Sequence, residues 1–141
     1  MLKLVPAIHR ATHRIGLYLA ALPDKGLSQG EAHILALHAT SGPSTIADLH
    51  KGLAHKRSTL TSILDRLADR GLITRAVGTA DRRTFVVTPT AKGRRIADRV
   101  HAHLADLERT VTSHLSANDL RACLKVITAV EEEAHRRASQ G

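Results

Sequence analysis

The chain has 141 residues, which fits one domain large enough to bury a hydrophobic core. Apolar residues make up 43% of it, but there is no Trp, one Tyr and one Phe. Because the apolar residues are mainly Leu, Ala, Ile and Val, the composition favours helices and argues against a β-sandwich or barrel.

The positive charge is concentrated in one segment. The chain carries 21 Lys/Arg and 13 Asp/Glu, a net charge of +8. Residues 51–95 hold eleven Lys/Arg and three Asp, whereas the rest of the chain holds ten basic and ten acidic residues. A basic segment between neutral arms is typical of a module that binds a polyanion. An anionic membrane is the competing partner, but the sequence has no basic amphipathic helix with a bulky apolar face.

Neither a secretion signal nor a membrane span is predicted. The first ten residues lack the apolar core of a signal peptide, and no apolar run approaches 18 residues. The single cysteine, Cys123, excludes an internal disulfide and a Cys-based zinc site. We therefore expect a cytoplasmic protein without a membrane partner, in which Cys123 is a small buried hydrophobic residue rather than a redox sensor.

Three helices are predicted in the first part of the chain. Apolar residues recur at helical spacing over residues 5–22, and a segment with Pro and Gly ends the pattern. Ser28 and Glu31 then form the pattern of a capping box at the start of a second helix. A third, short helix is expected over residues 44–53.

The next helix, expected over residues 56–71, has two contrasting faces. Four apolar residues share one face, and Gly71 is placed as a C-terminal capping glycine. Hydroxyls and basic groups on the other face suit a DNA groove, because hydroxyls and helix N–H groups bind phosphates and Arg binds guanine. This polar face consists of Arg57, Ser58, Thr61, Ser62, Asp65, Arg66 and Asp69. The same pattern also fits an ordinary amphipathic helix with a solvated face.

A change to strand-like patterns follows this helix. Residues 72–77 and 84–88 are predicted as the two strands of a β-hairpin, and the loop between them contains two adjacent arginines. Directly after a basic helix, such a tip suits a contact with the DNA backbone or minor groove, although a solvated turn is the simpler alternative. The helices expected over residues 44–53 and 56–71, joined by a tight turn, have the form of a helix-turn-helix.

Two further helices are predicted at the C-terminal end. Thr90 opens a long helix with a nearly heptad apolar pattern, and Ser116 with Asp119 forms a capping box before a last helix. The nearly heptad positions are Ile96, Val100, Leu104, Leu107 and Val111. In the last helix, the apolar residues that we expect inside are Leu120, Leu124, Ile127 and Val130. We interpret the first helix and these two as a dimerisation layer, with packing on the central segment of the same chain as the alternative.

Two blocks of the sequence resemble the MarR family of winged helix-turn-helix transcription regulators. Residues 58–75 are similar to its recognition helix and first wing strand, and residues 81–93 to its wing motif, Asp-Arg-Arg followed by a strand and Thr-x-x-Gly. The resemblance implies a mainly α fold with a minor β part over the whole chain. It places a winged helix-turn-helix lobe with a small β-hairpin wing at residues 28–89, and helical dimerisation regions at residues 1–22 and 90–138.

The resemblance also implies a homodimer that binds a pseudo-palindromic operator in double-stranded DNA. Such regulators are usually repressors relieved by a small-molecule effector, which is expected between the dimerisation helices and the DNA-binding lobe, with no residues assigned. By family pattern, Asp81 and Arg83 shape the wing, and Arg82 or Arg83 contacts the minor groove. The DNA-binding residues carried over to the helix are Ser58, Thr59, Thr61 and Ser62, to which we add Arg57 and Arg66 from their charge and position.

The sequence departs from the family pattern around the turn before the recognition helix. Ala54 replaces the usual turn glycine, and Lys56 replaces the usual N-cap serine. His50 stands where a small Ala is usual, and Ser62 stands where Arg is frequent. These differences concern the operator sequence and the local geometry rather than the fold.

Other functions find less support in the residues. No phosphate-binding loop or catalytic constellation is recognised, so we expect no enzyme and no cofactor. A metal-responsive regulator is one alternative, because His9 and His13 lie one helical turn apart and could share a metal with other side chains. The completing ligands considered are Glu31, His33, His101 and His103; no metal site is predicted. The other alternative is a non-specific DNA-binding architectural protein.

Overall fold

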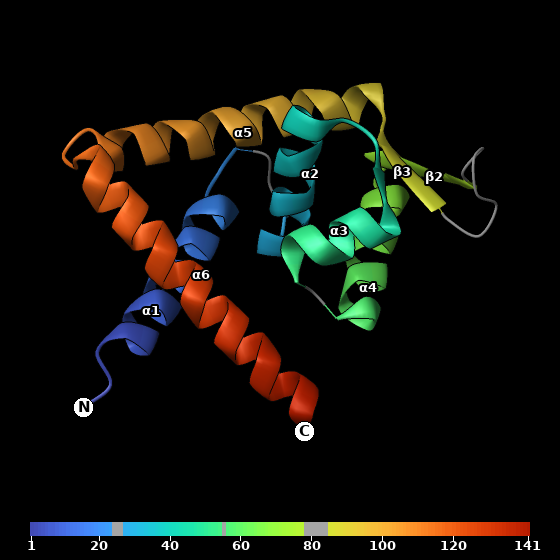
Figure 1. Cartoon of the computed structure of the whole chain (residues 1–141). Coiled ribbons are helices and arrows are strands. Elements are labelled where there is room, and N and C mark those ends of the chain that lie inside the picture. Colours follow the sequence, from blue (N-terminus) through green and yellow to red (C-terminus); the bar gives the residue numbers. More distant parts are fainter. Residues whose placement is uncertain (24–26, 55, 78–84) are drawn as a thin grey trace. The chain divides into compact units, whose positions relative to one another are not determined.

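The structure is a computed structural model that describes residues 1–23, 27–54, 56–77 and 85–141 (Figure 1). Within these ranges the elements are α1 (Leu4–Ala20), α2 (Gln29–Ser41), β1 (Ser44–Thr45), α3 (Ile46–Leu53), α4 (Arg57–Asp69), β2 (Ile73–Val77), β3 (Phe85–Pro89), α5 (Ala91–Thr112) and α6 (Ala117–Gln140). The mainly helical fold with a small β part is confirmed. None of the helices in these ranges is long and apolar enough to cross a membrane.

The chain divides into two compact units, residues 1–102 and 103–141, and the boundary falls inside α5. The first unit contains the hydrophobic core, to which α1, α2, α3, α4, the sheet and the start of α5 contribute. Its largest fully buried side chains are Leu19, Ile34, Leu35, Leu49, Leu60, Leu64, Leu67, Leu72, Val87 and Val100. Burial of this set is the main force that holds the helices of the first unit together.

A three-stranded antiparallel sheet completes the first unit, in the order β1-β3-β2. The predicted hairpin is present, and it pairs Ile73 with Pro89 at one end and Val77 with Phe85 at the other. The two-residue strand β1 was not predicted, because Ser44 and Thr45 were assigned to the start of a helix. They pair instead with β3, and Thr45 caps α3 through its hydroxyl.

The junction between α4 and α5 is held by Thr90. Its hydroxyl donates to the carbonyl oxygen of Gly71 (2.7 Å) and accepts from the backbone N–H of Gly93 (3.0 Å). The backbone N–H of Thr90 donates to the carbonyl oxygen of Leu72 (3.0 Å). The Thr-x-x-Gly sequence therefore connects the C-terminal end of α4 to the start of α5.

The second unit contains the end of α5 and all of α6. The capping box predicted for Ser116 and Asp119 is confirmed, with both hydrogen bonds at 3.0 Å. The apolar side chains predicted to lie inside are not buried: α6 has no buried residue, and Leu124 and Ile127 are 55% and 43% exposed. The prediction that Cys123 is buried is also wrong, because its side chain is exposed. A helix with its apolar stripe uncovered has no core residues beside which the cysteine could be enclosed.

Candidate nucleic-acid interface

Helix α4 separates its apolar and polar side chains completely. Leu60, Ile63, Leu64 and Leu67 are at most 3% exposed and pack into the core. The candidate DNA-binding side chains on this helix are all exposed: Arg57, Ser58, Thr59, Thr61, Ser62 and Arg66. The buried face fixes the helix to the rest of the unit, so its polar face is presented outward on a rigid support.

The N-terminal end of α4 is open. Lys56 occupies the N-cap position, and its side chain makes no capping hydrogen bond. The first-turn N–H groups of a helix without a side-chain cap are available to an anion, which the helix dipole also favours. Thr61 donates its hydroxyl to the carbonyl oxygen of Arg57 (2.9 Å), which leaves its methyl group as an exposed apolar contact.

The C-terminal end of α4 is closed by a Schellman motif. Gly71 has a φ of 70°, and its N–H donates to the carbonyl oxygen of Ala68 (2.9 Å). The N–H of Leu72 donates to the carbonyl oxygen of Leu67 (3.0 Å). This geometry confirms the capping role predicted for Gly71, and it directs the chain into β2.

The turn before α4 is made without glycine. Ala54 has a φ of 56° and a ψ of 20°, so a residue with a Cβ occupies the left-handed region. Its N–H donates to the carbonyl oxygen of His50 (3.0 Å) and closes the end of α3. Ala54 therefore replaces the usual turn glycine at a position where the backbone conformation favours glycine.

A buried carboxylate connects α2 to α4. Glu31 is 3% exposed, and its two oxygens lie 3.1 Å from Nε of Arg66 and 3.4 Å from Nη1 of Arg70. The complete capping box predicted for Ser28 is wrong in this respect. Ser28 accepts from the backbone N–H of Glu31 (3.2 Å), but the Glu31 side chain turns to the arginines instead of back to Ser28.

A second ion pair connects α4 to the wing. Nη1 of Arg75 on β2 lies 2.8 Å from Oδ1 of Asp65, and both side chains are at least one-third exposed. The sequence alone predicted no function for Arg75. No sequence pattern pairs it with Asp65, because the contact depends on how the hairpin returns beside the helix.

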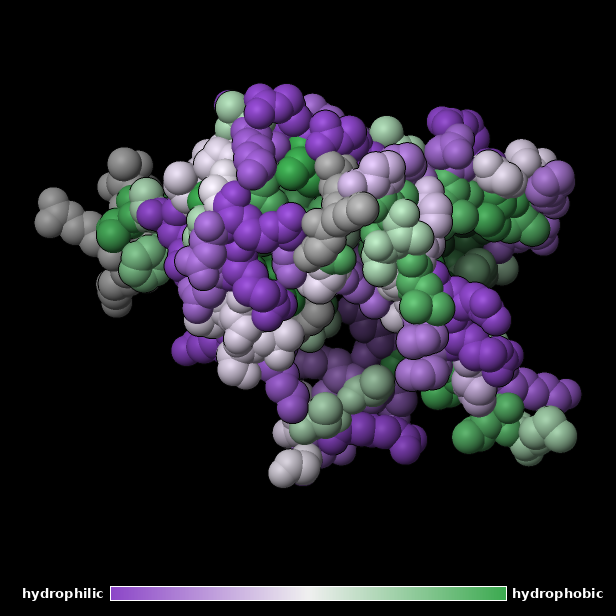
Figure 2. Space-filling view, turned by 180° about the vertical axis from the view of Figure 1, so that it is seen from behind, coloured by the Kyte–Doolittle hydropathy of each residue, from purple (hydrophilic) through white to green (hydrophobic). Residues whose placement is uncertain are grey.

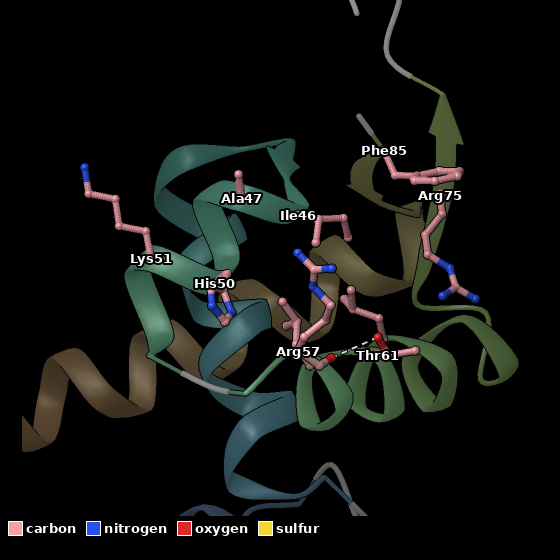
Figure 3. A pocket seen from close by; sticks show the side chains of 10 residues that line it. Ile46, Ala47, His50, Lys51, Arg57, Thr61, Arg75 and Phe85 are labelled. Atoms are coloured by element: carbon pink, nitrogen blue, oxygen red, sulfur yellow. Dashed lines mark hydrogen bonds between the residues drawn. The ribbon is translucent and has the colours of Figure 1, made fainter. Parts of the chain in front are cut away.

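A cavity of about 720 Å³ opens between α3, α4 and the hairpin. Its floor is apolar, with Leu60 and Leu64 among the lining residues, and its rim carries His50, Arg57 and Arg75. In Figure 3, Arg57 extends from α4 into the space beside α3, while Lys51 points away from it. The cavity therefore borders the same basic side chains as the exposed face of α4.

The predicted wing-tip residues, Asp81, Arg82 and Arg83, lie outside the described residues. The hairpin that carries them is described as far as the pair Val77 and Phe85. Their assigned functions therefore stay predictions.

The histidines considered as metal ligands do not form a site. Among the residues that the structure describes, no three His, Cys, Asp or Glu side chains are grouped so that they could hold a metal ion. Glu31, one of the possible ligands, binds two arginines instead. His38, which the sequence analysis did not single out, is buried on α2, and neither ring nitrogen has a hydrogen-bond partner among the described atoms.

Comparisons with known proteins agree with this geometry. The sequence model of the MarR family matches residues 27–85. The S. aureus MepR–DNA complex has a TM-score of 0.79 and 19% identity, and the match covers 95% of this chain and 99% of MepR. A mutant MarR from E. coli, complexed with operator DNA, has a TM-score of 0.70 and 24% identity, with 90% of each chain covered.

A third structure of similar fold is the PcaV transcriptional regulator from Streptomyces coelicolor in complex with its natural ligand. It has a TM-score of 0.71 and 21% identity, with 94% of each chain covered. The search of curated proteins found no match. Residues 27–85, which include the helix-turn-helix, match the MarR family model, and the fold of the described residues is shared with the three solved structures.

Proposed function

We propose that this protein is a sequence-specific transcription regulator, not an enzyme, and that it binds a pseudo-palindromic operator in double-stranded DNA as a homodimer. The observation that carries the proposal is the separation of faces on α4. Its apolar side chains are fixed in the core, while its hydroxyls, Arg57 and open N-terminus are presented outward. A helix of this kind can enter the major groove end-first.

The chemistry of the exposed face supports DNA as the partner. The uncapped first turn of α4 suits a phosphate, Arg57 suits a phosphate or a guanine, and the Thr61 methyl suits the methyl group of thymine. The concentration of positive charge in residues 51–95 supplies the long-range attraction to DNA. We further propose that Arg82 or Arg83 at the wing tip contacts the minor groove and that Asp81 with Arg83 shapes the tip.

Exposed apolar side chains support the homodimer. Leu4, Val5 and Leu17 are exposed on α1, and Leu124 and Ile127 on α6. Green, hydrophobic patches interrupt the hydrophilic surface in Figure 2. Association through these helices would bury the apolar side chains and present two recognition helices to a two-fold symmetric DNA site.

We propose that the protein is a repressor relieved by a small molecule. The support comes from relatives: PcaV has a natural ligand, and the DNA binding of BpsR from Bordetella bronchiseptica is regulated by 6-hydroxynicotinic acid. Release requires that the ligand binds more tightly to a form in which the two recognition helices no longer fit the operator. We expect the effector between the dimerisation helices and the DNA-binding lobe, and we assign no residues to its pocket.

The test is fluorescence anisotropy with labelled duplexes from the DNA that flanks the protein's own gene. A scrambled duplex of the same composition is the control, and both are titrated at two salt concentrations. We expect a preference of about a thousandfold or more for one flanking duplex, with an affinity that falls steeply as salt rises. Equal affinity for every duplex would contradict the proposal and favour the non-specific architectural protein.

A further inference from the structure

Glu31 is the acidic side chain with which α2 holds α4. Its carboxylate accepts from Nε of Arg66 (3.1 Å) and from Nη1 of Arg70 (3.4 Å), although the three residues are 35 and 39 positions apart in the chain. The side chain of Glu31 is 4% exposed, whereas those of Arg66 and Arg70 are 53% and 37% exposed. The carboxylate is thus enclosed, and the two guanidinium groups reach it from the surface of α4.

The enclosed carboxylate depends on its partners. A buried charge that loses its hydrogen-bonded partner is strongly unfavourable, so Glu31 favours the arrangement that keeps both arginines near it. The backbone of Glu31 is itself fixed, because its N–H donates to the Ser28 hydroxyl (3.2 Å) at the N-cap of α2. The carboxylate therefore extends from the capped first turn of α2.

Two attachment points on one helix control its rotation. Arg66 lies in the last turn of α4 and Arg70 is its C-cap residue, four positions later, so the two side chains lie near each other at the C-terminal end of the helix. An anchor that holds both of them resists rotation of α4 about its own axis as well as tilting. The exposed residues of the first turns are then aimed in one direction.

Arg66 also lies far along α4 from the N-terminal turns that suit DNA. Nine positions separate Arg66 from Arg57, which is about 14 Å along a helix. Arg57 lies at the open N-terminus and borders the cavity, whereas Nε of Arg66 is used by Glu31. The two arginines that the sequence analysis treated alike are in different surroundings.

We propose that Glu31 is a positioning residue of the DNA-binding surface: by holding Arg66 and Arg70 it fixes the rotation of α4, and it keeps Arg66 out of contact with DNA. This inference rests on the proposed function for its effect on operator recognition. It assigns the operator contacts to the first turns of α4, and to Arg66 the ion pair with Glu31.

The test compares Glu31→Gln, Arg66→Gln and the double variant with Arg57→Gln as the matched control. Binding to the best flanking duplex and to the scrambled duplex is measured by anisotropy at four salt concentrations, and the oligomeric state of each variant is checked. We expect Glu31→Gln to lower the operator-to-scrambled affinity ratio by about tenfold or more. Adding Arg66→Gln to it should change the ratio less than twofold, because the two residues act together.

The salt dependence separates positioning from direct contact. Arg66→Gln should leave the slope of log affinity against log salt at its wild-type value, while Arg57→Gln should reduce the magnitude of that slope by about two, one for each protomer of the dimer. A slope whose magnitude is reduced by Arg66→Gln would show that Arg66 contacts DNA and overturn the proposal. A Glu31→Gln variant whose affinities for both duplexes fall in parallel would also overturn it, because that result indicates general destabilisation.

Failure of the proposed function is a separate result. If the wild-type protein prefers none of the flanking duplexes, the regulator proposal fails on that measurement alone. The slope for Arg66→Gln on the scrambled duplex still tests whether Arg66 contacts DNA. Denaturant unfolding of the wild type, Glu31→Gln, Arg66→Gln and the double variant still tests whether Glu31 and Arg66 are coupled. Independent residues would give additive changes in the free energy of unfolding.

Discussion

His38 has a polar ring in a site that offers it no polar partner among the described atoms. The side chain is 4% exposed, and burial lowers its pKa below the ordinary value of 6.5. The neutral ring is therefore the form that the folded state favours, while the unfolded chain takes up a proton more readily. Acid should shift the equilibrium toward the unfolded state through this residue.

The sign of the pH dependence follows directly. Above pH 6.5 the His38 ring is neutral in both the folded and the unfolded state, so the full stability of the folded state is present. As the pH falls from 6.5 through the lowered pKa of the folded state, the unfolded chain binds more protons, and the free energy of unfolding decreases. We expect urea unfolding to give a larger loss of stability between pH 7.5 and 5 for the wild type than for His38→Leu. At pH 7.5, His38→Leu should change the free energy of unfolding by no more than about 1 kcal/mol, in the stabilising direction. Equal pH dependence in the two proteins would contradict this account of His38.

Ala54 is the other residue in an unfavourable state, because its backbone conformation is one that residues with a Cβ rarely adopt. Its left-handed conformation, with a φ of 56°, costs about 1–2 kcal/mol for a residue with a Cβ. Glycine removes that cost but loses about 0.4–1 kcal/mol through the greater freedom of the unfolded chain. We expect Ala54→Gly to stabilise the protein by about 0.5–1 kcal/mol in urea unfolding. A destabilised Ala54→Gly variant would show that the left-handed conformation is not strained.

The connection between α4 and α5 depends on the absence of a side chain at Gly93. A Cβ there would lie 1.9 Å from the carbonyl oxygen of Leu72, which is backbone and cannot move aside cheaply. Gly93→Ala should therefore destabilise the first unit by several kcal/mol, on the order of 3, or prevent folding. Circular dichroism and thermal unfolding are the measurements.

Gly52 is the matched control within α3. A Cβ at this position would make an ordinary contact of 3.8 Å with the side chain of Leu37. Gly52→Ala should be neutral or stabilising by about 0.5–1 kcal/mol, because alanine has the higher helix propensity. Similar effects of the two substitutions would contradict the close approach at Gly93.

The sequence predicted those elements whose signal is local. Helical spacing, the capping residues Ser116 and Asp119, and the alternating strands gave all six helices and the hairpin within the described residues. The strand β1 was missed because two residues carry no periodicity. The contacts of Glu31 and Arg75 were missed because they join elements far apart in the sequence.

The same limit applies to the last helix. An apolar stripe shows that a face of the helix avoids water, but it does not show what covers that face. Leu124 and Ile127 were expected inside, and within this chain they are exposed. The helical spacing alone placed the candidate residues on the outer face of α4, because the apolar residues on the opposite face were expected to be buried in the core.

The exposed stripe on α6 leads to a prediction about assembly. Leu124→Asp together with Ile127→Asp should convert a dimer to a monomer, because two charges would replace apolar surface at the interface. Operator affinity should then fall about a hundredfold or more, since a monomer contacts one half-site. Sedimentation equilibrium and anisotropy are the two measurements.

Lys125→Asp is the control for that substitution. It introduces the same acid at a neighbouring exposed, polar position of α6. This variant should remain dimeric and keep its operator affinity within a few fold. A doubly substituted protein that also stays dimeric would place the dimer interface elsewhere.

The central claim is that the outer face of the first turns of α4 reads the operator. The most direct measurement is the operator affinity of Thr61→Glu, beside Ser139→Glu at the exposed end of α6 as a charge-matched control. We predict that Thr61→Glu lowers operator affinity by at least about a hundredfold, because a carboxylate then faces phosphates and base edges, while the dimer persists and Ser139→Glu binds as the wild type does. Undiminished operator binding by a folded, dimeric Thr61→Glu variant would contradict the claim.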